Sequence, residues 1–250
     1  MTHGVGAVVV THGADPELAR CLAALAPQVD ELVVVANPPV PEIDAPLIVN
    51  DSPLGFAANA NKGIAATGAP YVVVANPDTV ARPDAVDLLR KFADVHPRAG
   101  IVGPQLLFPD GRWQPSRRSF PTVFGTIVRR TPLRKVLHPE TQQLHHYLLE
   151  DRPTDPTRAD WMLAAFLLLR RTMVDELDGF DPGYRLYGED IDLCYRAAKA
   201  GWERWYVPEA IVTHAHAAVT DRRFLTRQTI WHWRGIMRFV RKHPERLKSL

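Results

Sequence analysis

Short apolar runs alternate with segments of helical periodicity in the first hundred residues, and this alternation limits the possible folds more than any other feature. Residues 5–11, 32–36 and 71–75 are apolar without a period of two, whereas residues 82–95 carry apolar side chains on one helical face. Strands of this kind, separated by helices, are typical of a parallel sheet covered on both faces. The sequence therefore predicts an α/β fold with a Rossmann-like, mostly parallel central sheet flanked by helices.

The alternation stops near residue 104 and resumes near residue 160. Residues 104–158 are rich in Pro and Arg and hold no strong periodic segment. Such a stretch is typical either of a functional lid or of a loosely packed surface excursion. The other expected strands are residues 46–50, 160–169 and 202–207, and the other expected helices are residues 16–25, 55–66, 171–177 and 188–200. With 250 residues, one domain over residues 1–220 is favoured over two.

The C-terminal segment is strongly basic, although the net charge of the chain is only +2. Residues 221–250 hold nine Lys and Arg against Asp221 and Glu245, a net +7, which leaves −5 for the rest. Apolar and basic residues recur there at helical spacing, which predicts an amphipathic helix over residues 221–243. Three interpretations stay open: peripheral contact with an anionic membrane, a solvated helix packed on the domain, or a homodimer contact.

Composition excludes several other classes of protein. Cys21 and Cys194 are the only two cysteines, so no disulfide framework and no cysteine-type zinc site supports the fold. The longest apolar run, residues 161–169, is far shorter than the roughly 20 residues of a spanning helix. No signal-peptide pattern opens the chain. A cytoplasmic protein, in contact with the inner membrane face at most peripherally, is expected.

Three polar clusters stand at the expected edges of strands and helices. Asn76 and Asp78 follow a strand directly, where an Asp can hold a divalent cation and a diphosphate, but where Asn-Pro-Asp also makes an ordinary turn. Glu189 and Asp190 open a helix, which suits either the helix dipole or a general base whose pKa is raised by crowding. His214 and His216 share one face of a strand, as metal ligands or as surface histidines.

Taken in order, these clusters resemble family 2 glycosyltransferases over residues 5 to about 220. The match rests on Asn76-Pro77-Asp78-Thr79, Trp161-Met162-Leu163-Ala164-Ala165, Gly179-Phe180-Asp181, Tyr187-Gly188-Glu189-Asp190-Ile191-Asp192-Leu193-Cys194-Tyr195-Arg196 and His214. Within the family, the chain is most similar to the bacterial rhamnosyltransferase-like branch, to which the segments at residues 109–111 and 117–121 also correspond.

The resemblance implies a GT-A fold with a C-terminal helical extension. It places a donor-binding half at about residues 1–105, an acceptor half at about residues 106–220 and the basic helix at residues 221–250. The implied activity is transfer of a sugar, rhamnose by this branch, from a nucleoside diphosphate donor to a glycan or lipid-linked acceptor, with inversion and with Mg²⁺ or Mn²⁺.

The resemblance also assigns the site residues. Asp190, together with Glu189, takes the catalytic position, and Asp78 and His214 take the metal positions. The nucleotide-sugar contacts it implies are Thr11, His12, Asn37, Gly55, Asn61, Asn76, Asp78 and Trp161. The chain departs from the family pattern at Ala36, Pro53 and Ala164, which are recognition positions rather than catalytic ones.

Those departures motivate an alternative, a catalytically weakened sugar-nucleotide-binding or scaffold protein derived from a transferase. A nucleotidyltransferase is less favoured, because residues 13–15 supply no Gly-rich, basic phosphate loop. No nucleic-acid partner is expected, since the sequence lacks an aromatic and basic sheet motif.

Overall fold

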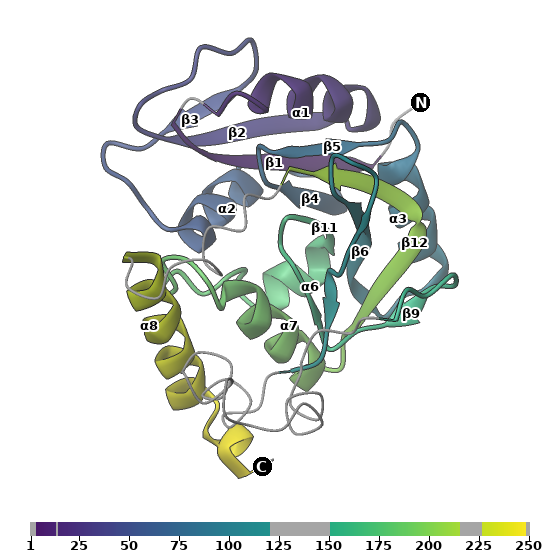
Figure 1. The fold of residues 1–250 in the computed structure, drawn as a ribbon, viewed down its shortest axis with the longest axis vertical. Coiled ribbons are helices and arrows are strands. Elements are labelled where there is room, and N and C mark those ends of the chain that lie inside the picture. The colour runs from purple at the N-terminus through teal and green to yellow at the C-terminus, as the bar shows by residue number, and fades with distance from the viewer. Residues whose placement is uncertain (1–3, 14, 121–150, 216–226, 249–250) are drawn as a thin grey trace.

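A central sheet organises the chain in a computed structural model that describes residues 4–13, 15–120, 151–215 and 227–248 (Figure 1). Its main path runs in the order β3-β2-β1-β4-β11-β6-β12-β5, with β7 paired to β6 and β9 to β12, while β8 and β10 form a small second sheet. The strands are β1 (Val5–His12), β2 (Glu31–Asn37), β3 (Leu47–Val49), β4 (Tyr71–Ala75), β5 (Thr79–Ala81), β6 (Ala99–Leu107), β7 (Trp113–Gln114), β8 (Arg117–Arg118), β9 (Thr157–Arg158), β10 (Trp161–Met162), β11 (Phe166–Arg170) and β12 (Glu203–His214).

The predicted parallel half is confirmed. The four strands β1, β2, β3 and β4 pair in parallel, so their carboxyl ends meet at one edge of the sheet. Beyond β4 the direction alternates, because β11 runs antiparallel to both β4 and β6, whereas β12 is again parallel to β6. A continuous sheet therefore passes through both expected halves, and the expected boundary near residue 105 falls inside β6. The division into donor and acceptor halves stays a prediction.

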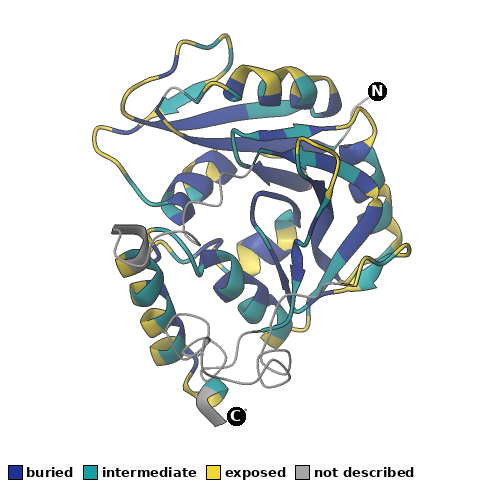
Figure 2. Ribbon diagram, in the orientation of Figure 1, coloured by how far each residue is buried: buried dark blue, intermediate teal, exposed yellow. Residues whose placement is uncertain are grey.

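Helices cover both faces of the sheet, as the apolar strands require. They are α1 (Leu18–Leu25), α2 (Phe56–Ala65), α3 (Ala85–Val95), α6 (Arg171–Glu176), α7 (Glu189–Lys199) and α8 (Arg227–Lys242), with short 3₁₀ helices η1 (Ala26–Gln28) and η4 (Pro244–Lys248). One face packs on α1 and α3, the other on α2, α6 and α7. Figure 2 shows the central strands largely buried between these layers. Cys21 and Cys194 are buried free thiols.

Strand β6 is an element that the sequence analysis missed. It is buried at all nine positions although it contains Gly100, Gly103 and Pro104. A Cβ at Gly100 would lie 2.7 Å from Met173 Sδ, and one at Gly103 would lie 2.7 Å from Met162 Sδ, so methionine side chains fill the space above both glycines. Residues that usually interrupt a strand are here required by close packing, which local periodicity does not reveal.

Three other expectations need adjustment. The run at residues 160–169 is two strands, β10 and β11, separated by residues 163–165, and β12 extends past residue 207 to His214. The segment at residues 104–158 contains the end of β6 and the short strands β7, β8 and β9 in its described parts. Residues 121–150, on which the lid interpretation mainly rests, and residues 221–226 of the expected tail helix lie outside the described part.

No helix in the described part of the chain is both long and apolar enough to cross a membrane. The C-terminal helix α8 is present and lies beside α7, away from the sheet (Figure 1).

Close packing of α2 on β1 yields a first testable prediction. A Cβ at Gly63 of α2 would lie 2.2 Å from Val8 Cγ1 and 3.1 Å from Val35 Cγ2, and both valines are fully buried. The Gly63→Ala substitution is therefore expected to lower the free energy of unfolding by about 1–3 kcal/mol, in spite of the better helix propensity of Ala. Urea denaturation measures the change.

Gly68→Ala is the matched control, since its Cβ would meet only Glu31 Oε1, at 3.9 Å. That variant is expected to stay within about 0.5 kcal/mol of the parent protein. Equal effects of the two substitutions would contradict the packing argument.

Candidate active site

Asp78 and His214 meet because two strand ends are paired. Asp78 lies in the turn between β4 and β5, and β5 pairs with the end of β12 so that Thr79 is opposite His214. This register places His214 Nε2 3.4 Å from Asp78 Oδ1. On its other side, His214 Nδ1 lies 3.0 Å from Gln114 Oε1 of β7, and the imidazole is buried.

The Asp78–His214 pair has the chemistry of a partial metal site. Because an amide oxygen only accepts, Gln114 Oε1 holds the ring proton on Nδ1. His214 Nε2 then faces a carboxylate oxygen, and a cation held between these two atoms would be bound by both. The described residues contain no group of three His, Cys, Asp or Glu able to hold a metal, and His216 lies outside them. An oxygen and an imidazole nitrogen fit a cation that takes its other ligands from phosphate and water.

Glu189 and Asp190 open α7, directly after a strained backbone. Tyr187 and Gly188 both adopt left-handed conformations, with φ of 72° and 101°. Such strain in a residue other than glycine clusters at functional sites, where the surrounding structure must hold it. Glu189 is buried and its Oε2 has no hydrogen-bond partner, whereas Asp190 is half-buried and its Oδ1 accepts the Ile191 N–H at 2.9 Å.

Electrostatics separate this pair from ordinary surface carboxylates. Burial, and after it the charge of Asp190, raises the pKa of Glu189. Burial also raises the pKa of Asp190, although the positive charge of Arg118 and the backbone amides of Ile191 and Ala164 act against the increase. A carboxylate with a raised pKa is a stronger base than an exposed one, so the Glu189–Asp190 pair has the electrostatics of a general base.

Residues 163–165 connect the two pairs. The Asn76 N–H donates to the Ala165 carbonyl oxygen at 2.8 Å, which joins this segment to the turn that carries Asp78. One residue earlier, the Ala164 backbone amide acts on the Asp190 carboxylate. Asp78 and Asp190, 112 residues apart in the sequence, therefore flank one short stretch of backbone.

Trp161 and Arg118 lie at the same end of that segment. They are opposite each other in the β8–β10 pairing, and the Arg118 guanidinium lies 5.2 Å from the centre of the Trp161 ring. Trp161 Nε1 donates to the Ser119 carbonyl oxygen at 2.8 Å, which fixes the indole. The structure thus places a cation beside Asp190 and supports that cation with a buried aromatic ring.

At the carboxyl ends of β1 and β2, the expected nucleoside contacts form a polar network. Asn37 Nδ2 donates to His12 Nδ1 at 2.6 Å and to the Leu54 carbonyl oxygen at 3.0 Å. Asn37 Oδ1 accepts from the Leu54 N–H and from Asn50 Nδ2, both at 3.0 Å. The buried Asn37 amide is fully used in holding this edge, and Thr11 Oγ1 bonds the Gly13 carbonyl oxygen at 3.0 Å. Among the residues of this network, His12 is exposed, whereas Thr11, Asn37 and Asn50 are buried.

Gly55 and Asn61 of the expected donor-side helix are tied to the loop before α7. A Cβ at Gly55 would lie 2.5 Å from the Arg185 carbonyl oxygen, which accepts the Phe56 N–H at 3.1 Å. Asn61 Oδ1 accepts the Phe180 N–H at 2.9 Å, and Asn61 Nδ2 donates to the Phe180 carbonyl oxygen at 2.7 Å. Both residues therefore join the donor edge to the segment that carries Asp190.

The sequence analysis missed three polar residues of this region. Gln114, Asn50 and Asn59 stand in no recognisable motif, and their roles depend on pairings between distant segments. Arg118 stands in the segment at residues 117–121 that the sequence marked, but nothing in its spacing indicated Asp190.

A comparison with protein-family models decides the family. The model described as glycosyltransferase-like family 2 matches residues 3–231. The chain belongs to glycosyltransferase-like family 2. It is thus a glycosyltransferase, as the motifs predict.

Curated relatives of this family 2 glycosyltransferase include two bacterial rhamnosyltransferases. The N-acetylglucosaminyl-diphospho-decaprenol L-rhamnosyltransferase of Mycobacterium tuberculosis is 32% identical, over 89% of this chain and 79% of the relative. The rhamnosyltransferase WbbL of Escherichia coli is 30% identical, over 68% of this chain and 61% of the relative.

Solved structures confirm the GT-A fold of the family 2 chain. GalNAc-T7, solved with UDP, GalNAc and Mn²⁺, superposes with a TM-score of 0.61 at 15% identity, over 84% of this chain and 42% of that one. The mannosyltransferase PcManGT from Pyrobaculum calidifontis, in complex with GDP-Man and Mn²⁺, has a TM-score of 0.55 at 15% identity, over 87% of this chain and 58% of that one.

The departures from the family 2 pattern do not fall on either charged pair. Ala36 is buried in β2 opposite Thr11, and Pro53 is exposed in the loop after β3. Ala164 is buried, and its backbone amide, not its side chain, acts on Asp190. These three side chains leave both charged pairs as described.

Proposed function

We propose that this glycosyltransferase transfers rhamnose from a nucleoside diphosphate donor to a lipid-linked glycan, with inversion at the anomeric carbon and with the assistance of Mg²⁺ or Mn²⁺. The observation that carries the proposal is that residues 163–165 contact both the turn bearing Asp78 and the carboxylate of Asp190. Residues 163–165 thus separate Asp78, which would hold the leaving diphosphate, from Asp190, which would deprotonate the acceptor. A single displacement with inversion requires such a separation.

In this mechanism, Asp78 and His214 would hold the cation together with the donor diphosphate, and Gln114 orients the imidazole. The cation, when bound, neutralises the charge that develops on the leaving diphosphate. Asp190 accepts the proton of the attacking acceptor hydroxyl, and burial strengthens it as a base by raising its pKa. The charge of Asp190 in turn raises the pKa of the buried Glu189.

The donor is held at the edge made by the carboxyl ends of β1, β2 and β4. His12 is exposed there and offers an aromatic ring, while Thr11, Asn37 and Gly55 shape the backbone around it. Asn76 and Asp78 face the diphosphate from the next strand end, and Asn61 holds the Gly179–Phe180 turn. Trp161 is buried under the Arg118 guanidinium and supports the sugar site from behind, through Arg118.

Rhamnose and a lipid-linked acceptor are proposed because the Mycobacterium tuberculosis relative named above, whose name gives both, aligns over most of both chains. The test is an assay of the purified chain with nucleoside diphospho-rhamnose, Mn²⁺ or Mg²⁺, and an N-acetylglucosaminyl-diphospho-polyprenol. We expect a rhamnosylated product of inverted configuration, abolished by a chelator. Donor binding without turnover on any acceptor would instead support the alternative of a weakened sugar-nucleotide-binding protein.

A lipid-linked acceptor implies contact with a membrane, and the outer face of α8 suits it. We define this outer face as Ile230, Trp233, Arg234 and Met237. Ile230 is 55% exposed and Met237 47% exposed, and Arg234 is exposed between them. Apolar side chains flanked by arginine are typical of helices that lie on an anionic bilayer.

Membrane contact through this outer face can be tested with vesicles. Vesicles with 30% anionic phospholipid are expected to bind the protein at low salt, and the double substitution Ile230→Ser with Met237→Ser is expected to weaken binding at least about tenfold. Sedimentation with vesicles measures the effect, and Val95→Ser, at another exposed apolar site on α3, is the matched control. No binding by the parent protein, or concentration-dependent dimerisation lost in the double variant, would contradict membrane contact.

A further inference from the structure

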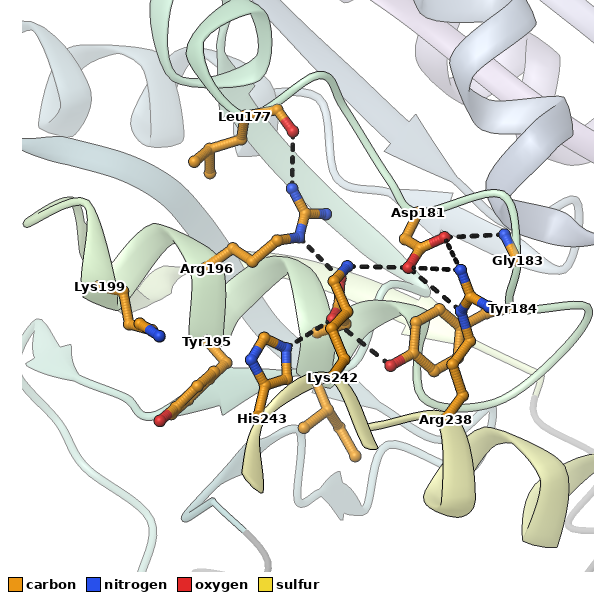
Figure 3. A network of polar contacts seen from close by, with 12 residues as sticks. Leu177, Asp181, Gly183, Tyr184, Tyr195, Arg196, Lys199, Arg238, Lys242 and His243 are labelled. Atoms are coloured by element: carbon orange, nitrogen blue, oxygen red, sulfur yellow. Dashed lines mark hydrogen bonds and ion pairs between the residues drawn. The ribbon is translucent and has the colours of Figure 1, made fainter. Parts of the chain in front are cut away.

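Ion pairs join α8 to two aspartates that flank the Glu189–Asp190 pair. Arg238 Nη2 lies 2.8 Å from Asp181 Oδ1, and Lys242 Nζ lies 2.8 Å from Asp181 Oδ2 (Figure 3). Lys242 Nζ also lies 3.0 Å from Asp192 Oδ2, on the other side of the pair. Lys242 thus bridges two carboxylates, one eight residues before Glu189 and the other two residues after Asp190.

Asp192 is the more deeply buried of the two. Its side chain is fully buried and contacts the hydroxyl of Tyr184 at 3.4 Å, Arg196 Nε at 2.7 Å and His243 Nε2 at 2.8 Å. Burial alone would raise the pKa of Asp192, but hydrogen bonds from His243, Arg196 and Lys242 lower it instead. The carboxylate two residues after Asp190 is therefore ionised and held in place from α8.

Asp181 is held in the same way. Burial would raise its pKa, but Arg238, Lys242 and the Gly183 N–H keep the pKa well below its usual range. The Arg238 guanidinium also lies 5.4 Å from the centre of the Tyr184 ring. The loop from Asp181 to Gly188, which contains no helix or strand, is thus fastened to α8 at its beginning.

The end of that loop is fastened by a close backbone approach. A Cβ at Gly235 of α8 would lie 2.2 Å from the Tyr187 carbonyl oxygen, so only glycine permits the observed packing. Tyr187 is the left-handed residue that precedes Gly188 and Glu189. The backbone of α8 therefore lies directly against the strained turn from which the Glu189–Asp190 pair starts.

At its C-terminal end, α8 packs on the side of α7. The Phe239 and His243 rings contact the Tyr195 ring, with centroids 5.6 and 4.6 Å apart. Beyond the helix, Glu245 of η4 pairs with Lys199 at 2.9 Å and accepts the Tyr195 hydroxyl at 3.1 Å. Contacts at both ends of α7 prevent α8 from moving independently of it.

We propose that α8 is a positioning element of the catalytic carboxylates, in which Gly235, Arg238 and Lys242 hold the segment from Asp181 to Asp192 so that Asp190 faces the acceptor. The inference rests on the proposed role of Asp190 as the base and adds to it a residue set 45 or more positions further along the chain. The segment needs support from outside, because the left-handed Tyr187 strains its backbone and the three carboxylates at residues 189–192 repel one another. Cations and close packing from outside the segment offset both.

The test compares Gly235→Ala and Arg238→Ala with the parent protein, using a soluble acceptor analogue so that membrane contact plays no part. Each variant is expected to lower kcat about tenfold or more, because small displacements of a base slow proton transfer strongly. The affinity for a nucleoside diphosphate with Mn²⁺, measured by calorimetry, is expected to stay within about twofold of the parent value, since that site lies on other elements. Arg238→Lys is expected to restore most of kcat.

Arg90→Ala is the matched control, since Arg90 of α3 also pairs with Asp87 at 2.8 Å on a helix surface. Its kcat is expected to equal that of the parent. An unchanged kcat in Arg238→Ala, or an equal loss of donor affinity and kcat, would overturn the inference. Failure of the proposed function itself would appear differently, as full activity of Asp190→Asn.

Discussion

Replacing Asp190 by Asn is expected to lower kcat by about 10²–10⁴-fold while donor binding is retained. The substitution keeps the shape of the side chain and removes its ability to take a proton. The half-buried Asp190 Oδ1 accepts the Ile191 N–H, a contact that the Asn carbonyl oxygen can preserve, so the start of α7 is expected to stay folded. Steady-state kinetics with a nucleoside diphospho-sugar and calorimetric titration with the nucleoside diphosphate separate the two effects.

Asp44→Asn is the control, because Asp44 is exposed in the loop before β3, and it is expected to leave kcat unchanged. Full activity of Asp190→Asn would remove Asp190 from the mechanism. A loss of donor affinity as large as the loss of kcat would instead assign Asp190 to binding.

The raised pKa of the Glu189–Asp190 pair adds a pH dependence to the same prediction. A general base works only when deprotonated, so kcat falls as pH drops through the pKa of the pair. Because burial raises both pKa values, this acid limb is expected above the value of about 4 that exposed carboxyl groups have. The repulsion within the pair raises the pKa of Glu189, so Glu189→Gln is expected to leave the limb, which follows Asp190, near its position in the parent protein.

Removing either member of the Asp78–His214 pair is expected to abolish metal-dependent donor binding. Asp78→Ala removes a carboxylate oxygen and His214→Ala an imidazole nitrogen, which are the two protein ligands that the described part of the chain brings together here. The affinity for a nucleoside diphosphate in the presence of Mn²⁺ is expected to fall at least about 10²-fold. Calorimetry with and without a chelator measures the metal-dependent part.

Gln114→Leu tests the support of that pair. Loss of the Oε1 contact at 3.0 Å frees the imidazole to change its orientation and tautomer, and outer-shell substitutions of this kind typically cost 10–100-fold in metal affinity. The expected effect is therefore smaller than that of His214→Ala. The pair would be excluded as a metal site if His214→Ala bound the donor with the affinity of the parent protein and a chelator did not weaken that binding.

Several elements were predictable because their signal is local. The buried β-branched runs of β1 and β4 and the amphipathic pattern of α3 depend on neighbours within a few residues, and the structure confirms all three. The motif around Glu189 is local as well, since the same few residues start a helix and carry its carboxylates. Strand β6 was missed for the opposite reason, because its glycines are explained only by methionines from distant segments.

The amphipathic tail shows how a correct local prediction can leave the role of an element open. Its sequence determined that a helix with basic and apolar stripes would form. It did not determine that Arg238 and Lys242 turn inward to Asp181 and Asp192, while Ile230 and Met237 stay exposed. Which stripe faces the protein depends on the charge of the surface it meets, and that surface is assembled from other parts of the chain.

By itself, then, the sequence determined the class of fold, the family and the chemical types available to the site. The tertiary structure alone decided which of them meet: Gln114 beside His214, Asn61 on the turn at Phe180, and α8 against the segment that carries Asp190. Local patterns arise from the geometry of helices and strands, which repeats every few residues. Contacts between segments a hundred residues apart depend on strand order and helix packing, which have no such repeat.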